Sequence, residues 1–209
     1  MKKLLLSALL LTLPATAQAH QVWIERDGNG PARIYLGEPA EILPVGGDPE
    51  FAKLKAPRVL SAPDAKQARK AGFLEVAVPA GDVHAWDDDV FAPWGPDGKK
   101  EGIVYYARAG RADTKAALAF EIAPVTPNGN RFIILREGKP VPKTQVTAIS
   151  PDKWTKTLIS DDAGTITVPV GGAGRYLLTA SLKEEGPHAM PAGTVATMHR
   201  ITTTSFVAR

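Results

Sequence analysis

The chain has 209 residues, of which 25 are lysine or arginine, 22 are acidic and none is cysteine. The lack of cysteine excludes disulfides, thiolate metal sites and thiol nucleophiles. No basic run and no basic patch mixed with aromatic residues is present, so we expect no nucleic-acid partner.

The first 19 residues have the pattern of a cleavable signal peptide. Lys2 and Lys3 form a positive start, residues 4–13 an apolar core, and Ala17-Gln18-Ala19 a small-residue cleavage motif. The apolar core is shorter than the roughly 20 residues that span a bilayer. We therefore expect cleavage after Ala19, a mature chain that begins at His20 and is not membrane-embedded, and a periplasmic location, with secretion as the alternative.

The first half of the mature chain predicts short strands separated by turns, the pattern of an all-β protein. The expected strands are 21–25, 32–37, 57–62, 73–78, 102–110 and 116–124. Residues 64–70 (DAKQARK) instead have a helical pattern of about two turns. Residues 81–98 have no strand pattern, and we expect a long acidic loop there.

The second half predicts six further strands after a break at 124–129, where two prolines and Asn-Gly stop regular structure. These strands are expected at 131–139, 144–150, 155–160, 165–170, 174–182 and 197–208, with a loop at 186–191. Such spacing is typical of a small sandwich. We therefore predict two tandem antiparallel β-sandwich domains, Ig-like or transthyretin-like, at 20–125 and 128–209, after a signal peptide at 1–19.

The second half also carries family-like motifs. Leu-Arg-Glu-Gly-Lys-Pro-Val at 135–141, Asp-Ala-Gly at 162–164 and Gly-Arg-Tyr-Leu-Leu-Thr-Ala at 174–180 resemble the transthyretin-like or carboxypeptidase-regulatory-like sandwich. This resemblance implies a fold and leaves the function open.

The whole mature chain resembles a family of bacterial periplasmic proteins with two β-sandwich domains. The resemblance is carried by Ala-His-Gln-Val-Trp-Ile at 19–24, Tyr-Leu-Gly-Glu at 35–38, and His199 ahead of a threonine-rich strand at 201–206. Members are described as accessory components of nickel or cobalt uptake. The resemblance thus implies a metal-binding protein that works with a membrane transporter or an outer-membrane receptor.

An N-terminal histidine has an unusual chemistry. The α-amine and the imidazole Nδ1 of His20 can bind one metal together, and a second imidazole would complete three nitrogens, which suits Cu(II) or Ni(II). We prefer His84 as the second imidazole, because nearby Asp87 could orient its ring. His199 is the alternative, since chain termini often lie close together.

The predicted metal ligands are thus His20, His84 and His199, for nickel, cobalt or copper. Because motifs of nucleophilic, phosphate-binding and zinc-protease sites are missing, we expect no enzyme, although a copper monooxygenase would also begin with histidine. The rival hypothesis is a metal-free binding or scaffold module that grips a glycan or a partner protein through Trp86 and Trp94.

Overall fold

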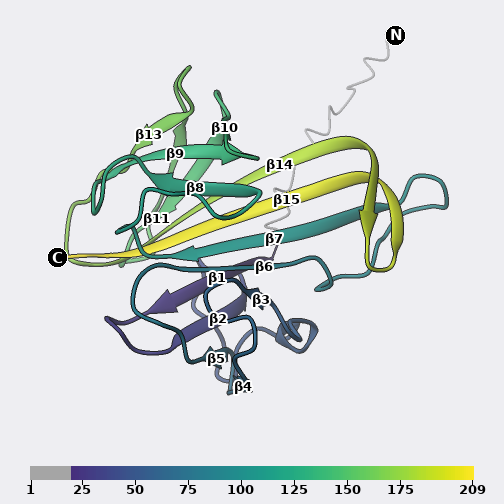
Figure 1. The fold of residues 1–209 in the computed structure, drawn as a ribbon, viewed down its shortest axis with the longest axis horizontal. Coiled ribbons are helices and arrows are strands. Elements are labelled where there is room, and N and C mark those ends of the chain that lie inside the picture. Colours follow the sequence, from purple (N-terminus) through teal and green to yellow (C-terminus); the bar gives the residue numbers. More distant parts are fainter. Residues whose placement is uncertain (1–19) are drawn as a thin grey trace, which may run out of the picture.

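The computed structural model describes residues 20–209, which form three layers of β-sheet (Figure 1). The all-β prediction is confirmed. The predicted signal peptide, residues 1–19, lies outside the described residues. Among the described residues no helix is both long and apolar enough to cross a membrane.

Two outer sheets of four strands cover a central sheet of seven. The first outer sheet has the order β1 (Gln21–Arg26), β2 (Ala32–Gly37), β5 (Leu74–Val76), β4 (Gln67–Arg69). The second contains β10 (Lys139–Pro140), β9 (Arg131–Arg136) and β13 (Thr165–Thr167), with β8 (Phe120–Pro124) also paired to β9. The central sheet has the order β12 (Thr155–Ile159), β11 (Gln145–Ile149), β14 (Gly174–Met190), β15 (Gly193–Ala208), β7 (Glu101–Ala109), β6 (Val83–Asp87), β3 (Arg58–Val59). One short helix, η1 (Phe51–Lys53), follows β2.

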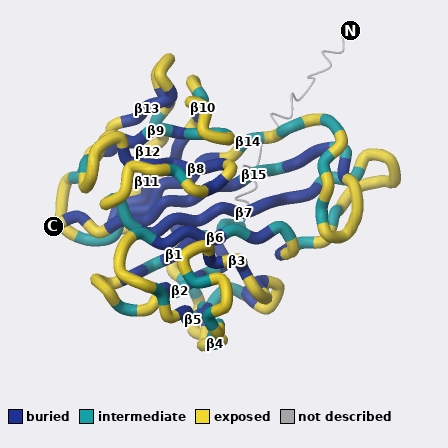
Figure 2. The backbone as a smooth tube through the Cα atoms, viewed as in Figure 1, coloured by how far each residue is buried: buried dark blue, intermediate teal, exposed yellow. Residues whose placement is uncertain are grey.

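Strand β7 is buried on both faces, as the dark blue tube in Figure 2 shows. Its odd-numbered residues, such as Ile103 and Tyr105, join a core shared with the first outer sheet. Its even-numbered residues, such as Val104 and Tyr106, join a second core shared with the second outer sheet. Alternation along a strand therefore supplies two cores from one element.

The threonine-rich strand β15 connects all three layers. The hydroxyl of Thr203 donates to the carbonyl oxygen of Val22 at 2.8 Å, and that of Thr204 donates to the carbonyl oxygen of Ile122 at 2.7 Å. Val22 is in β1 and Ile122 is in β8, both at the edge of an outer sheet. Hydroxyl groups at successive positions of β15 thus donate hydrogen bonds to edge carbonyl groups of both outer sheets. These buried carbonyl groups would be costly if they were left unpaired.

The sheets are antiparallel apart from one pair. Strands β7 and β15 run parallel, with Thr197 opposite Glu101 and Ser205 opposite Ala109. The central sheet therefore takes strands from both sides of the expected linker, and β8, which precedes the linker, pairs with β9, which follows it. The division into 20–125 and 128–209 stays a prediction.

Three local predictions are wrong. Residues 67–69 form β4 and pair with β5, because sheet pairing outweighs the weak helix tendency of a two-turn segment. The expected loop at 81–98 begins with β6, since Val83 and Ala85 alternate into the first core. The expected loop at 186–191 is mostly strand, because β14 continues to Met190 past a register shift between Glu185 and His188.

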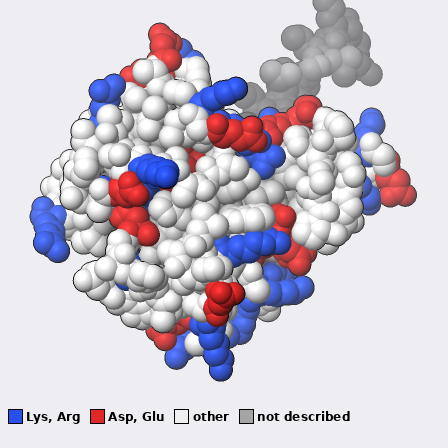
Figure 3. Space-filling model, in the orientation of Figure 1, with Lys and Arg blue, Asp and Glu red and all other residues white. Residues whose placement is uncertain are grey.

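Charges of both signs are interspersed on the face of the described residues drawn in Figure 3. One cluster joins the second outer sheet to the central sheet. The carboxylate of Glu184 in β14 accepts hydrogen bonds from Arg136 Nε of β9 at 2.6 Å and Arg200 Nε of β15 at 2.7 Å. The bond from Arg136, together with that from Arg200, outweighs burial and lowers the pKa of Glu184 from 4.5 to about 2.

Because the folded-state pKa of Glu184 is depressed, its stabilising effect is complete above about pH 4.5 and is lost as the pH falls toward 2. We expect Glu184→Gln to lower the free energy of unfolding by about 1.5–3 kcal/mol at neutral pH, the scale of hydrogen bonds to charged groups. Urea unfolding at neutral and acidic pH measures this. Glu137→Gln is the control. Glu137 is exposed, and its ion pair with Arg136 is expected to contribute under about 1 kcal/mol. A Glu184→Gln effect that persists at pH 2 would contradict the assignment.

Candidate functional site

A cavity of about 540 Å³, the His20 pocket, lies on the central-sheet face that carries the first core. Its floor is formed by Ile103 and Tyr105 of β7 and His199 and Ile201 of β15. Its walls include His20 and the segment 91–94. The pocket therefore brings together two of the three predicted metal ligands, His20 and His199, from the two ends of the described chain.

His20 directly precedes β1 and is held by carboxylates. Its Nε2 is 3.1 Å from Asp48 Oδ1 and 3.7 Å from Glu50 Oε2. Asp48 also accepts a hydrogen bond from the backbone N–H of Glu50 at 2.7 Å, which fixes the carboxylate within its own loop. The ring of Phe91 meets the imidazole edge-on, with 6.2 Å between centroids. The His20 ring is therefore oriented by the loop that contains Asp48.

That loop depends on close packing of two glycines. A Cβ on Gly47 would lie 2.3 Å from the Cα of Gly72, and Gly47 has a φ of +92°. Neighbouring Gly46 has the same φ, but a Cβ there would meet nothing within 4 Å. Substitutions at Gly46 and Gly47 would therefore both strain the backbone, but only the one at Gly47 would also create a steric conflict.

We expect Gly46→Ala to cost about 1–3 kcal/mol of stability, the scale of backbone strain. Gly47→Ala is expected to cost a further 1–3 kcal/mol or so, because the methyl group overpacks the contact with Gly72. Chemical denaturation of both variants measures the difference. Equal effects would mean that the contact at Gly72 relaxes freely.

His199 is held in a similar way on the floor of the pocket. Its Nε2 is 2.5 Å from Glu101 Oε2, and its ring stacks on Trp94 with 5.6 Å between centroids. The backbone N–H of Trp94 donates to the carbonyl oxygen of Glu101 at 3.0 Å, so the tryptophan and the carboxylate are linked through one bridge. His199 and Ile201 are two positions apart in β15, so both side chains lie on the face of the sheet that borders the pocket.

The pocket favours a cation electrostatically. The carboxylates of Asp48, Glu50 and Glu101 lie beside the two imidazoles, and Lys53 is paired with Glu50. Burial, together with the charge of Glu50, raises the pKa of the Tyr105 hydroxyl well above its ordinary value. Tyr105 therefore stays neutral at physiological pH. The three carboxylates outnumber the one lysine, Lys53, so the charged side chains beside the imidazoles are mostly negative.

His84 lies elsewhere. It is in β6, 8% exposed, and faces β8, where its Nε2 is 3.2 Å from Glu121 Oε1 without a well-aligned hydrogen bond. Asp87, three residues on, accepts from the N–H of Asp89, and alternation along β6 directs it to the opposite face from His84. The structure thus does not bring His84 to His20, and Asp87 does not orient its ring.

His84 belongs to a buried charged cluster between the central sheet and β8. Arg108, with no exposed side-chain surface, donates to Glu121 and to Asp82, each at 2.6 Å. Glu121 also accepts from the N–H of Leu118 at 2.8 Å. Burial raises the pKa of Glu121, but His84, Arg108 and the Leu118 amide outweigh it, so the pKa is lowered. This cluster has its own internal partners.

The two tryptophans of the rival hypothesis lie apart. Trp86 is half-buried against the second core, with the guanidinium of Arg58 4.2 Å from its ring centroid. Trp94 is 41% exposed and lines the His20 pocket. Only Trp94 is therefore placed to touch a ligand in this pocket.

Side chains alone do not complete a metal centre here. Within residues 20–209, no group of three or more histidine or acidic side chains is arranged to hold a metal ion. A metal at the His20 pocket would need a further donor. The α-amine that cleavage ahead of His20 would create is such a donor, and it would adjoin the imidazole of His20 on the same residue.

Comparisons of the chain with protein-family models, with curated proteins and with solved structures found no match.

Proposed function

We propose that the chain is a non-enzymatic metal-binding protein for nickel, cobalt or copper. Its ligands are the α-amine and imidazole of His20 and the imidazole of His199. The observation that carries this is that His20 and His199 line one pocket, each with its Nε2 within hydrogen-bonding distance of a carboxylate. His84, engaged with the Glu121 cluster, is left out of this proposed ligand set.

The carboxylates support a metal role for the opposite ring nitrogen. Asp48 and Glu101 accept from Nε2, which keeps the proton on that nitrogen and leaves Nδ1 as the basic one. Nδ1 is also the nitrogen that closes a chelate ring with the α-amine of the same residue. A carboxylate behind the imidazole is the usual way in which proteins orient a metal-ligating histidine.

The donor set favours particular ions. An amine and two imidazoles are nitrogen donors, which suit Cu(II) and Ni(II) in tetragonal geometry. The surrounding carboxylates add a local negative charge that attracts any divalent cation. We place the protein in the periplasm after removal of residues 1–19, where it would pass metal to a membrane transporter or an outer-membrane receptor.

The two outer sheets, each packed on one face of the central sheet, support a reading as two sandwiches. In this reading the strands of 128–209 form the transthyretin-like unit. They contribute β9 to β13 and the long β14–β15 hairpin.

Calorimetric titration of the protein that begins at His20 with Ni(II), Co(II) and Cu(II) tests this function. We expect one equivalent of at least one ion to bind with submicromolar affinity. The affinity should fall as the pH falls, because protons compete for imidazole and amine lone pairs. Binding weaker than micromolar for all three ions would contradict it.

One observation favours the metal-free alternative. Trp94, Phe91 and the His199 ring all line the His20 pocket, and exposed aromatic rings also bind sugars and protein side chains. If glycan or peptide ligands bind the metal-free protein, and Trp94→Ala abolishes this binding, the pocket serves that function instead.

A further inference from the structure

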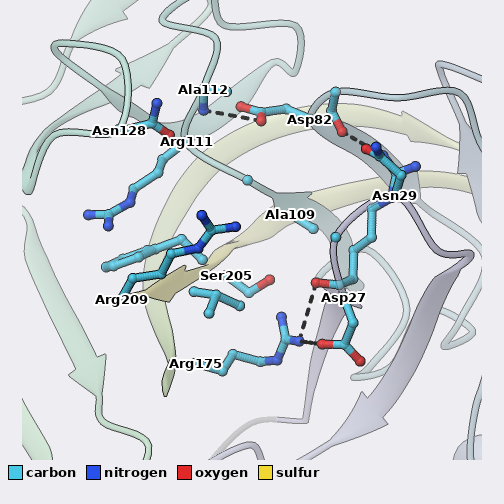
Figure 4. Close-up of a pocket in the computed structure, with 16 residues that line it drawn as sticks. Asp27, Asn29, Asp82, Ala109, Arg111, Ala112, Asn128, Arg175, Ser205 and Arg209 are labelled. Carbon is cyan, nitrogen blue, oxygen red and sulfur yellow. Dashed lines mark hydrogen bonds and ion pairs between the residues drawn. The ribbon is translucent and has the colours of Figure 1, made fainter. Parts of the chain in front are cut away.

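A second cavity, of about 940 Å³, lies at the other end of β7 (Figure 4). It is bounded by the ends of β1, β7 and β15 and the beginnings of β6 and β14. In β7, Ala109 lines this cavity, whereas Ile103 and Tyr105 line the His20 pocket. The two cavities are therefore separated along the strand. We call it the arginine cavity.

Arginine dominates the charge of this cavity. Four arginines line it, Arg26, Arg111, Arg175 and Arg209, and Figure 4 labels the last three. The two acids of the lining are already engaged. Asp82 accepts from Arg108 at 2.6 Å, and Asp27 is paired with Arg33 and Arg175.

Arg26 is a buried cation with only neutral partners. It is 8% exposed, and it donates to the carbonyl oxygens of Gly30 at 2.9 Å, Gly81 at 2.6 Å and Val78 at 3.3 Å. Among residues 20–209 it forms no ion pair, and its partners are these carbonyl oxygens. A buried charge without a counter-ion is costly, so an anion in the cavity would be stabilised there.

Arg111 presents an unused binding edge. Its Nη1 donates to the carbonyl oxygen of Gly129 at 3.2 Å and to the side chain of Asn130, and its guanidinium lies 4.4 Å from the Phe206 ring centroid. Within the described part of the chain, its Nε and Nη2 have no hydrogen-bond partner and it has no ion pair. Burial lowers the pKa of the Arg111 guanidinium. The Nε–Nη2 edge is a fork that fits carboxylate or phosphate oxygens.

We propose that the arginine cavity binds a small organic polyanion that carries carboxylate or phosphate groups. One oxyanion group would pair with the Nε–Nη2 edge of Arg111, and a second would lie toward Arg26. The volume is within the range of pockets for small molecules. This site is separate from the metal function and does not depend on it.

Calorimetric titration of the metal-free protein with citrate and with inorganic phosphate at low ionic strength tests the site. We expect at least one probe to bind, with an affinity that falls as sodium chloride is added. Arg111→Gln should weaken binding by about 10- to 100-fold, the equivalent of losing a charge-assisted hydrogen bond. Citrate binding alone would assign carboxylate ligands, and phosphate binding alone would assign phosphoryl ligands.

Arg58→Gln is the matched control, because Arg58 also lies over an aromatic ring but outside the cavity. It should bind like the parent protein, and so should His199→Ala. Arg111→Lys keeps the charge but lacks the fork, so it is expected to fold and to bind more weakly than the parent. No binding of either probe at millimolar concentration would overturn the site. Equal affinity in the parent and in the folded Arg111 variants would also overturn it, because the probe would then be an adventitious ion only.

Discussion

A chain that carries one extra residue ahead of His20 is expected to bind Ni(II) or Cu(II) at least about 100-fold more weakly than the chain that begins at His20. The extension converts the α-amine into an amide, which removes one donor and the chelate ring. Loss of a partner behind a ligand already costs 10- to 100-fold or so, and loss of a ligand should cost more. His199→Ala is expected to have an effect of similar size. Both are measured by calorimetric titration.

His188→Ala is the matched control for these two changes. His188 is in β14 and is not among the residues that line the His20 pocket, and its Nε2 lies 3.2 Å from the carbonyl oxygen of Glu184. Its removal should leave metal affinity unchanged. If the extended chain binds as tightly as the chain that begins at His20, the amine is not a ligand, even if metal binds elsewhere. If His199→Ala binds normally, the third nitrogen comes from another residue.

Glu121→Ala is expected to destabilise the fold by about 3–5 kcal/mol, the scale at which removal of one partner breaks a buried ion pair. Arg108 and Glu121 have no exposed side-chain surface, and the remaining carboxylate, Asp82, serves one side of the guanidinium only. The amide of Leu118 would also lose its acceptor. Guanidinium chloride unfolding at neutral pH measures the loss.

The matched control for this change is Asp162→Ala. Asp162 pairs with Lys143 at 2.6 Å, but both side chains are exposed, so the loss should stay below about 1 kcal/mol. Because the pKa of Glu121 is lowered in the folded state, its contribution is present above the ordinary carboxyl pKa and is lost as the pH falls below it. A Glu121→Ala effect no larger than that of Asp162→Ala would show that the cluster contributes little to stability.

Local patterns predicted much of the fold, and pairing between distant segments limited the rest. Short strand-like runs divided by turn residues, together with the motifs between 135 and 180, were sufficient to predict an all-β chain. The helix predicted over residues 64–70 is wrong because pairing with β5, and not the local sequence, makes residues 67–69 a strand. The parallel pairing of β7 with β15 has no signature in either strand, since register depends on the three-dimensional partner.

The residues of the candidate site could likewise be predicted only in part from the sequence. His20 was found from its place at the predicted cleavage point, and His199 from a resemblance and from the closeness of termini. Asp48 and Glu101 were missed because only the folded chain places them beside the two imidazoles. His84 was preferred because Asp87 is three residues away in sequence, but period-two alternation in β6 places these two side chains on opposite faces. The arginine cavity had no sequence signal, as its arginines are scattered from position 26 to 209.

The central position of β15 has a consequence for the order of folding. It follows every other described strand in sequence, yet β7, β14 and the edge carbonyls of β1 and β8 all depend on it. A nascent chain that ends before β15 can therefore complete neither core. We expect such a chain to remain unfolded, and we expect folding to be slow once β15 arrives, because its pairing with β7 closes a very long loop.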